Sequence, residues 1–158
     1  MASRNSYFLI FIIPPMFLGE YSHTIDDKGR MAVPAKFRNT LQSGAVVTRG
    51  LDNCLFLFSK EEWRKLADQI AGAPINKANT RAFGRFMLAG AMEAEFDRQG
   101  RILLPEYLRQ YANLRKQAIV AGLYNRIEIW EEGAWKKYSK ATEKNSGRIA
   151  EGLGELGM

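Results

Sequence analysis

The sequence has little of what cross-links a protein covalently or through a metal ion. Its 158 residues contain one cysteine, Cys54, and one histidine, His23. A disulfide needs two thiols, and a structural zinc site needs about four Cys or His ligands, so neither can form within one chain. We expect no metal and no cofactor. Because 46% of the residues are hydrophobic, packing alone can hold the fold.

Long hydrophobic runs are also missing. The apolar stretch Tyr7–Ile13 stops at Pro14 and Pro15, far short of the roughly 20 residues that a membrane-spanning helix needs. Arg4 is the only basic residue before the stretch, and no small-residue cleavage site follows it. Both features argue against a secretory signal. We therefore expect no membrane partner and a cytoplasmic protein.

Basic residues outnumber acidic ones, 23 to 17, which gives a formal net charge of +6. A small protein with this excess is suited to a polyanionic partner such as nucleic acid, although many basic proteins bind none. The charged fraction of 25% and the aromatic fraction of 11% are ordinary for a folded chain and argue against general disorder.

The chain contains an internal repeat. The segment FLGEYSHTIDDKGRMAVPAKFR, residues 17–38, aligns with LAGAMEAEFDRQGRILLPEYLR, residues 88–109, at a constant offset of 71. The identities in register are Gly19 with Gly90, Asp26 with Asp97, Gly29 with Gly100, Arg30 with Arg101, Pro34 with Pro105, and Arg38 with Arg109. The match continues at an offset of 72, from Val47 over Ile119 to Trp63 over Trp135. Each copy is therefore one supersecondary unit.

The two copies predict the same order of elements: a strand, a tight turn, a strand, a short helix, a hairpin and a longer helix. In the first copy the second strand is residues 30–33, the short helix 35–41, the hairpin 45–48 with a strand from 55, and the longer helix opens at a capping-box pattern, Ser59 to Glu62. The counterparts in the second copy are residues 101–104, 106–114, 118–121, a strand from 127, and 135–142.

Between and after the copies lie less regular segments. Residues 81–88 predict a helix with Phe83, Phe86 and Met87 facing inward. Glycines after Lys144 favour a tail without an ordered element. We divide the chain into an extension that is not native or is disordered (1–15), a first half (16–74), a helical linker (75–86), a second half (87–143) and a flexible C-terminal tail (144–158).

Both predicted turns carry the pattern Asp-x-x-x-Arg, from Asp26 to Arg30 and from Asp97 to Arg101. The carboxylate can accept hydrogen bonds from turn amides or pair with the arginine across the hairpin. Two interpretations stay open on this chemistry: a structural turn in which the arginine is held by its own aspartate, or a binding loop.

Neighbouring cations favour binding at the first turn. Lys28 and Arg30 together could face a phosphate and a base edge, which one paired arginine could not. Arg98 and Arg101 offer a similar pair in the second copy. The candidate DNA-binding residues are Arg30, Lys28, Arg101 and Arg98, and the candidate turn residues are Asp26, Gly29, Asp97 and Gly100.

From Met16 to about residue 145 the chain resembles the MraZ family of bacterial transcriptional regulators, encoded at the head of the division and cell-wall gene cluster. The segments that carry the resemblance are MFLGEYSHTIDDKGRMAVPAKFR, DRQGRILLP and the spacing between them. The family's start at Met-Phe-x-Gly implies that Met16 is the natural start, and the extension before it departs from the family pattern. The resemblance implies an α+β, mainly β, barrel-like fold: a pseudo-twofold tandem of two swapped-hairpin AbrB-like halves with short flanking helices.

The resemblance also implies a function. It implies a nucleoid-associated, ring-shaped homo-oligomer that binds repeated boxes of double-stranded DNA in its own promoter, with no small-molecule substrate. Arg30 then matches the arginine expected to contact DNA, with Lys28 beside it, whereas Arg98 and Arg101 have a partly structural role. Seven aromatic residues exceed the needs of one small barrel and could either build the oligomer or lie in the core of the monomer: Phe56, Phe58, Trp63, Phe83, Phe86, Trp130 and Trp135.

Two rival functions remain. An enzyme is disfavoured because His23 has no counterpart in the second copy, no phosphate-binding glycine loop is present, and Cys54 sits beside alternating apolar residues as a small buried hydrophobe would. The other rival is an AbrB-like antitoxin or scaffold that acts through protein contacts, which a neighbouring toxin gene would indicate.

Overall fold

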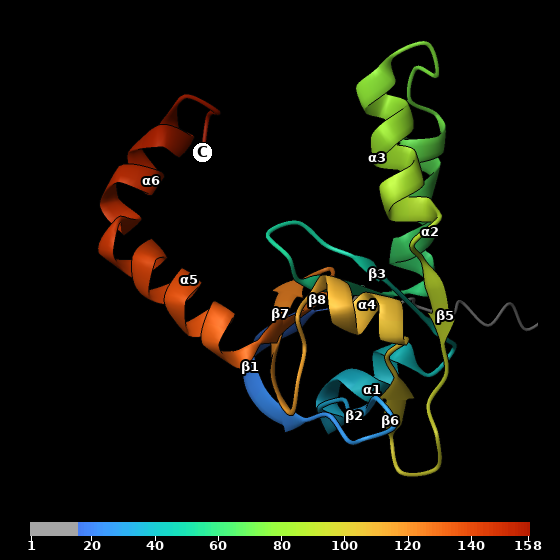
Figure 1. Cartoon of the computed structure of the whole chain (residues 1–158). Coiled ribbons are helices and arrows are strands. Elements are labelled where there is room, and N and C mark those ends of the chain that lie inside the picture. Colours follow the sequence, from blue (N-terminus) through green and yellow to red (C-terminus); the bar gives the residue numbers. More distant parts are fainter. Residues whose placement is uncertain (1–15) are drawn as a thin grey trace, which may run out of the picture.

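The computed structural model describes residues 16–158, so the expectation for residues 1–15 lies outside the described part (Figure 1). The chain is a mixed α+β protein, as expected. Its strands are β1 (Phe17–Thr24), β2 (Arg30–Ala32), β3 (Ala45–Arg49), β4 (Leu55–Ser59), β5 (Met92–Ala94), β6 (Arg101–Leu103), β7 (Gln117–Tyr124) and β8 (Ile127–Glu131). Its helices are α1 (Ala35–Leu41), α2 (Lys60–Ala71), α3 (Ala78–Leu88), α4 (Glu106–Tyr111), α5 (Glu132–Lys144) and α6 (Ser146–Gly154).

The strands form two antiparallel sheets. The larger has the order β1-β7-β8-β4-β3-β5, and the smaller pairs β2 with β6. The order is symmetric on exchange of the two repeat copies, because β1 pairs with β7 of the second copy and β5 pairs with β3 of the first. At the centre, Phe56 of β4 lies opposite Glu128 of β8. The two copies therefore interleave within one sheet.

The expected barrel is not closed in residues 16–158. The six-stranded sheet ends at β1 and β5, and β2 pairs with β6 instead of extending either edge. Next to each turn, one isolated bridge pairs the two sides of the hairpin, Ile25 to Met31 and Phe96 to Ile102. Since pairing stops at one bridge, β2 and β6 leave the plane of the large sheet and form a separate small one.

Strand side chains alternate between two hydrophobic clusters. In β4, Leu55 and Leu57 belong to the larger cluster, whereas Phe56 and Phe58 belong to the smaller. The larger cluster also takes in β2 and β6 residues and α1 and α4 side chains, and the smaller one contains α2, α3 and α5 side chains. The large sheet is therefore covered on one face by the small sheet with α1 and α4, and on the other face by α2, α3 and α5.

Of the two places that the sequence leaves open for the seven aromatic residues, an oligomer surface or the core of the monomer, the structure puts most of them in the core. Phe56, Phe58 and Trp130 are buried, and Trp63, Phe86 and Trp135 pack against them half-buried. Phe83, expected to face inward, is 40% exposed. Helix α3 is held by its other end, where Met87 is buried and Thr48 Oγ1 donates to the Met87 carbonyl at 2.7 Å.

The start of α2 follows the sequence pattern in part. Ser59 Oγ accepts a hydrogen bond from the Glu62 N–H at 3.3 Å, as the first half of a capping box requires. The Glu62 carboxylate, however, pairs with Lys65 Nζ at 2.7 Å. Only the Ser59 half of the capping box therefore forms, and the Glu62 side chain instead makes an ion pair with Lys65 along the helix.

The tail also differs from expectation, since Ser146–Gly154 form helix α6. Starting a helix is the costly step, and extending one is cheap. Helix α5 ends at Lys144, and the Asn145 N–H still reaches the Ala141 carbonyl at 3.2 Å. A second helix can therefore begin at once despite its glycines, with Ile149 and Leu153 one turn apart and both exposed.

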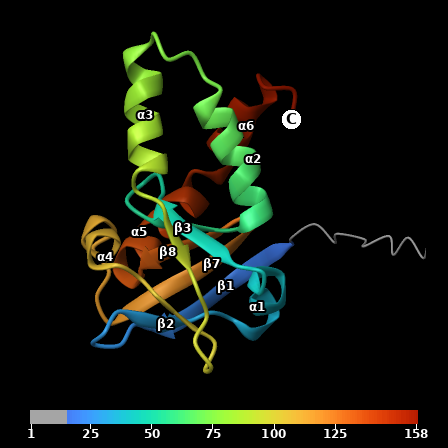
Figure 2. The same cartoon turned by 90° about the vertical axis from the view of Figure 1, so that its right-hand side faces the viewer.

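The turns singled out by the repeat lie at one end of the molecule. Figures 1 and 2 place β2 and β6 at the end away from α2, α3 and α6. The β1–β2 turn and the β5–β6 turn, residues 26–30 and 97–101, are thus presented together and away from the long helices.

The central strand β4 offers a test of this packing. Leu57 is fully buried in the larger cluster, so we expect Leu57→Ala to lower the free energy of unfolding by about 2 to 5 kcal/mol. Urea denaturation would measure it, with Leu51→Ala as the control because Leu51 is 53% exposed. Equal losses in the two variants would contradict the placement of the core.

Candidate functional site

The first turn is held by the Asp26 carboxylate. Its Oδ1 accepts the backbone N–H groups of Lys28 at 3.0 Å and Arg30 at 2.9 Å, and its Oδ2 accepts Arg30 Nε at 2.7 Å. The Gly29 N–H closes the turn on the Asp26 carbonyl at 2.9 Å. Gly29 has φ +83°, a conformation that glycine adopts without a steric penalty. The motif thus builds the turn and also directs the arginine.

The second turn repeats this arrangement. Asp97 Oδ1 accepts the N–H groups of Gln99 at 2.9 Å and Arg101 at 3.0 Å, and Oδ2 accepts Arg101 Nε at 2.9 Å. The Gly100 N–H reaches the Asp97 carbonyl at 3.1 Å, with φ +73° at Gly100. The same pattern of residues therefore gives the same local geometry in both copies.

Backbone pairing brings the two turns together. In the small sheet Met31 lies opposite Ile102, and both side chains are fully buried. Beyond the strands, the Leu104 N–H donates to the Gly29 carbonyl at 2.9 Å, and the Val33 N–H donates to the Gly100 carbonyl at 3.3 Å. Each turn is therefore bonded to the strand end of the other copy, and the two form one unit.

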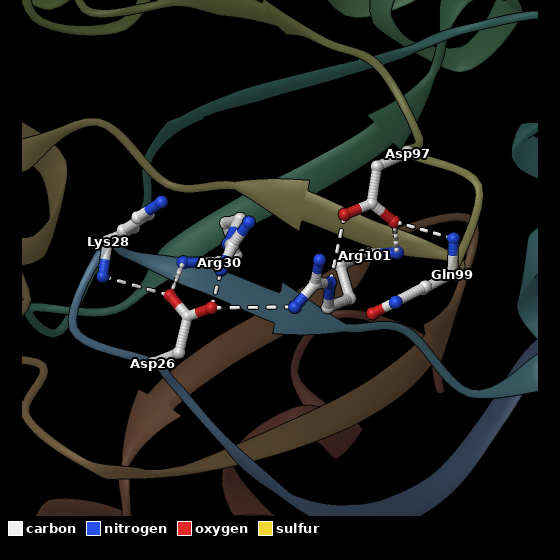
Figure 3. Close-up of polar contacts among 6 residues, drawn as sticks. All are labelled: Asp26, Lys28, Arg30, Asp97, Gln99 and Arg101. Atoms are coloured by element: carbon white, nitrogen blue, oxygen red, sulfur yellow. Dashed lines mark hydrogen bonds and ion pairs between the residues drawn. The ribbon is translucent and has the colours of Figure 1, made fainter.

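The two arginines are used differently. Arg101 Nη1 lies 3.6 Å from Asp26 Oδ2, in addition to its bond to Asp97, so this guanidinium bridges the two carboxylates. Figure 3 shows Arg30 and Arg101 side by side, with Asp26 reaching both. Within residues 16–158, the side-chain bond of Arg30 is through Nε, and Nη1 and Nη2 make no ion pair. Arg30 can therefore still donate to a ligand.

The other two candidate cations, Lys28 and Arg98, are exposed. Lys28 lies one residue from Gly29 on the turn that presents Arg30, and Figure 3 shows its side chain directed away from Asp26. Arg98 borders an open cleft of about 760 Å³ between the second turn and α1, with Arg38 and Lys60. All four predicted cations lie on or beside the paired turns.

Two residues near the site were given no role by the sequence pattern. The side chain of Arg109 packs on Gly29, and that of Arg38 packs on Gly100. The repeat alignment pairs Arg38 with Arg109, which was the available signal, but the alignment does not say what they contact.

The turn hydrogen bonds stabilise the ionised carboxylates. The pKa of Asp26 is lowered, first by the Arg30 backbone N–H and then by the Arg30 side chain and the Lys28 N–H. The pKa of Asp97 is lowered in the same way by Arg101 and Gln99. Both turns are therefore built around a charged aspartate.

The residues expected to have no catalytic role lie elsewhere. Cys54 is fully buried, as expected, and burial raises the pKa of its thiol. His23 is half-buried in β1, and burial lowers its pKa. No group of three His, Cys, Asp or Glu residues in the described chain is arranged to hold a metal ion. None of the helices from residue 16 onward is long and apolar enough to cross a membrane.

We expect acid to remove the stability that the two ionised aspartates give to the turns. A carboxyl whose pKa is lower in the folded than in the unfolded state stabilises the fold fully above its ordinary pKa and loses that effect as the pH falls. We expect the double variant Asp26→Asn, Asp97→Asn to melt below the wild type at pH 7, with the gap closing below about pH 4. Thermal melts from pH 7 to 2.5 measure this, with Asp68→Asn on α2 as control. A gap that did not change with pH would refute the role of ionised carboxylates.

Comparison with known proteins agrees with the repeat. The family model described as "MraZ protein, putative antitoxin-like" matches the chain twice, over residues 16–86 and 87–152. A protein named Transcriptional regulator MraZ from Pediococcus pentosaceus is 47% identical over 143 residues, which cover 90% of this chain and all of the relative. A protein of the same name from Caldanaerobacter subterraneus is 49% identical over 138 residues, 87% of this chain and 96% of the relative. Since the family model covers most of the chain and such relatives are nearly half identical to it, the chain belongs to the MraZ family.

Proposed function

We propose that this protein is a transcriptional regulator that binds double-stranded DNA through its two paired turns. The observation that carries the proposal is the side-by-side placement of two Asp-x-x-x-Arg turns, one of which leaves the Arg30 Nη groups without an ion pair in residues 16–158. The relatives' shared name, Transcriptional regulator MraZ, supports it.

The two turns have different roles in the proposed complex. A guanidinium held at Nε by a carboxylate keeps a fixed direction and can donate two parallel hydrogen bonds from its Nη atoms, the geometry that reads a guanine edge or clamps a phosphate. Arg30 has this geometry, and exposed Lys28 beside it suits a phosphate. Arg101 is engaged with Asp26 and Asp97, so its contribution is mainly to hold the turns, and Arg98 adds a phosphate contact.

Assembly supplies the affinity that one chain lacks. Two basic turns make about two to four phosphate contacts, which gives weak binding at physiological salt. We therefore propose a ring-shaped homo-oligomer that presents the turns to repeated boxes, so that later contacts form at high effective concentration. The proposed boxes lie in the protein's own promoter, ahead of the division and cell-wall genes, in the cytoplasmic nucleoid. Each protomer is then a tandem of two swapped-hairpin halves.

A second candidate is an antitoxin or scaffold, which the words "antitoxin-like" in the family description favour. In that case the paired turns would bind a protein partner or DNA beside a toxin gene. Co-purification of a toxin encoded next to this gene would support it, whereas neighbouring methyltransferase and division genes would support the regulator.

The role of Arg30 can be tested by substitution. Arg30→Ala should abolish binding to the upstream DNA of its own gene while leaving the oligomer intact, because it removes the free donors but not the buried strand pairing. Arg101→Ala should weaken binding or assembly less severely. Gel shifts and size-exclusion chromatography measure both effects, with Arg64→Ala on α2 as a matched control. Unchanged gel shifts for Arg30→Ala would overturn the assignment.

The role of assembly is tested by the DNA itself. We expect affinity to rise steeply with the number of boxes and to fall steeply between low and moderate salt, with a slope of about 0.9 in the logarithm of salt for each phosphate contact. Fluorescence anisotropy with one, two and three boxes measures both dependences. A single box bound as tightly as several would contradict binding through multiple turns.

A further inference from the structure

Each turn is covered by an arginine from the other repeat copy. An ideal Cβ placed on Gly29 would lie 2.7 Å from Nε and 2.8 Å from Cζ of Arg109. A Cβ placed on Gly100 would overlap Nη1 of Arg38 and lie 2.8 Å from its Cζ. Both guanidinium groups thus occupy the space where any other residue type would have its side chain.

These arginines occupy equivalent places in the fold. Arg38 is in the last turn of α1, which follows β2, and Arg109 is in the last turn of α4, which follows β6. Because β2 pairs with β6, each short helix ends beside the turn that precedes the partner strand. The symmetric pairing of the copies therefore brings each arginine to the opposite turn.

Charge pairing does not explain their position. Neither Arg38 nor Arg109 takes part in an ion pair within residues 16–158. Arg109 Nε instead donates to the Leu104 carbonyl at 2.9 Å, and the Leu104 N–H donates to the Gly29 carbonyl at 2.9 Å. A short chain of bonds thus joins the arginine through Leu104 to the glycine that it covers.

The contact of Arg38 with the second turn is weaker than the contact of Arg109 with the first turn. Arg38 Nε is buried and has no hydrogen-bond partner in the described chain, and the bond from the Val33 N–H to the Gly100 carbonyl is 3.3 Å long. A buried donor without a partner costs stability. The turn that presents Arg30 is therefore held more firmly than the turn that presents Arg101.

We propose that Arg38 and Arg109 are positioning residues that brace the DNA-contacting turn of the opposite repeat. Arg109 braces the turn of Lys28 and Arg30, and Arg38 braces the turn of Arg98 and Arg101. This inference rests on the proposed function for its consequence in DNA binding, but the bracing itself is a property of the free protein. A planar guanidinium covers a glycine Cα in a way that a lysine ammonium on a flexible stem does not.

Hydrogen exchange in the protein without DNA tests the bracing. Arg109→Met should speed exchange of the Gly29 and Arg30 amides about fivefold or more, on the scale of one lost neutral hydrogen bond, and leave the Gly100 and Arg101 amides unchanged. Arg38→Met should do the reverse with a smaller change. Exposed Arg64→Met serves as control. Faster exchange in the turn of the same repeat, or in neither turn, would overturn the proposal.

DNA binding by the same variants tests the consequence. Arg109→Met should weaken binding to the upstream DNA about tenfold or more, with Arg109→Lys failing to restore it, whereas Arg38→Met should weaken binding less. The slope of affinity against salt separates positioning from contact: an unchanged slope supports bracing, and a slope lower by about 0.9 would show that Arg109 itself contacts a phosphate and would overturn it.

Two further outcomes keep the tests separate. If Arg109→Met does not fold, exchange in Arg109→Lys decides, since faster Gly29 exchange supports the brace and wild-type exchange overturns it. If the wild type binds no upstream DNA while the exchange pattern holds, the proposed function fails and the brace stands.

Discussion

The pairing of β2 with β6 is the interaction on which the rest of this structure depends. It is only three residues long on each strand, yet it joins the two repeat copies at the point where each carries its Asp-x-x-x-Arg turn. Met31 and Ile102, opposite each other in this pairing, are fully buried in the larger cluster. The pairing therefore connects the hydrophobic core directly to the exposed turns.

A repeated motif need not have a repeated role. Asp26 and Asp97 make the same hydrogen bonds to their own turns, but Asp26 Oδ2 also receives Arg101 Nη1 at 3.6 Å. One additional ion pair commits Arg101 to the structure and leaves the Nη groups of Arg30 available. In the proposed complex this small asymmetry decides which copy recognises DNA and which copy supports it.

Much of the local structure could be predicted from the sequence. The Asp and Gly residues of each turn, the alternating Leu55 to Phe58 and the Ser59 cap are local signals, and the structure has a turn, a strand and a helix start at those positions. The approximate place of Arg30 followed from the turn alone.

The remaining features depend on contacts between distant residues. Nothing in the turn pattern states that β2 pairs with β6 or that Arg101 reaches Asp26, because strand partners are chosen by the whole core. The alignment of Val47 with Ile119 was wrong. Val47 lies opposite Met92, and Tyr21, the counterpart of Met92 in the first copy, lies opposite Val120. The sheet register therefore makes Val120 the counterpart of Val47. The prediction missed helix α6 because it considered only the glycines of the tail. It did not take into account that α5 ends at Lys144, directly before α6 begins.

We propose above that the paired turns form the surface that binds DNA. Amide chemical shifts of the protein, recorded with and without upstream DNA that carries several boxes, test it most directly. We predict the largest chemical-shift changes at residues 26–30 and 97–101, with α2 and α3 little affected. Changes confined to α2, α3 and α6, with both turns unperturbed, would contradict it.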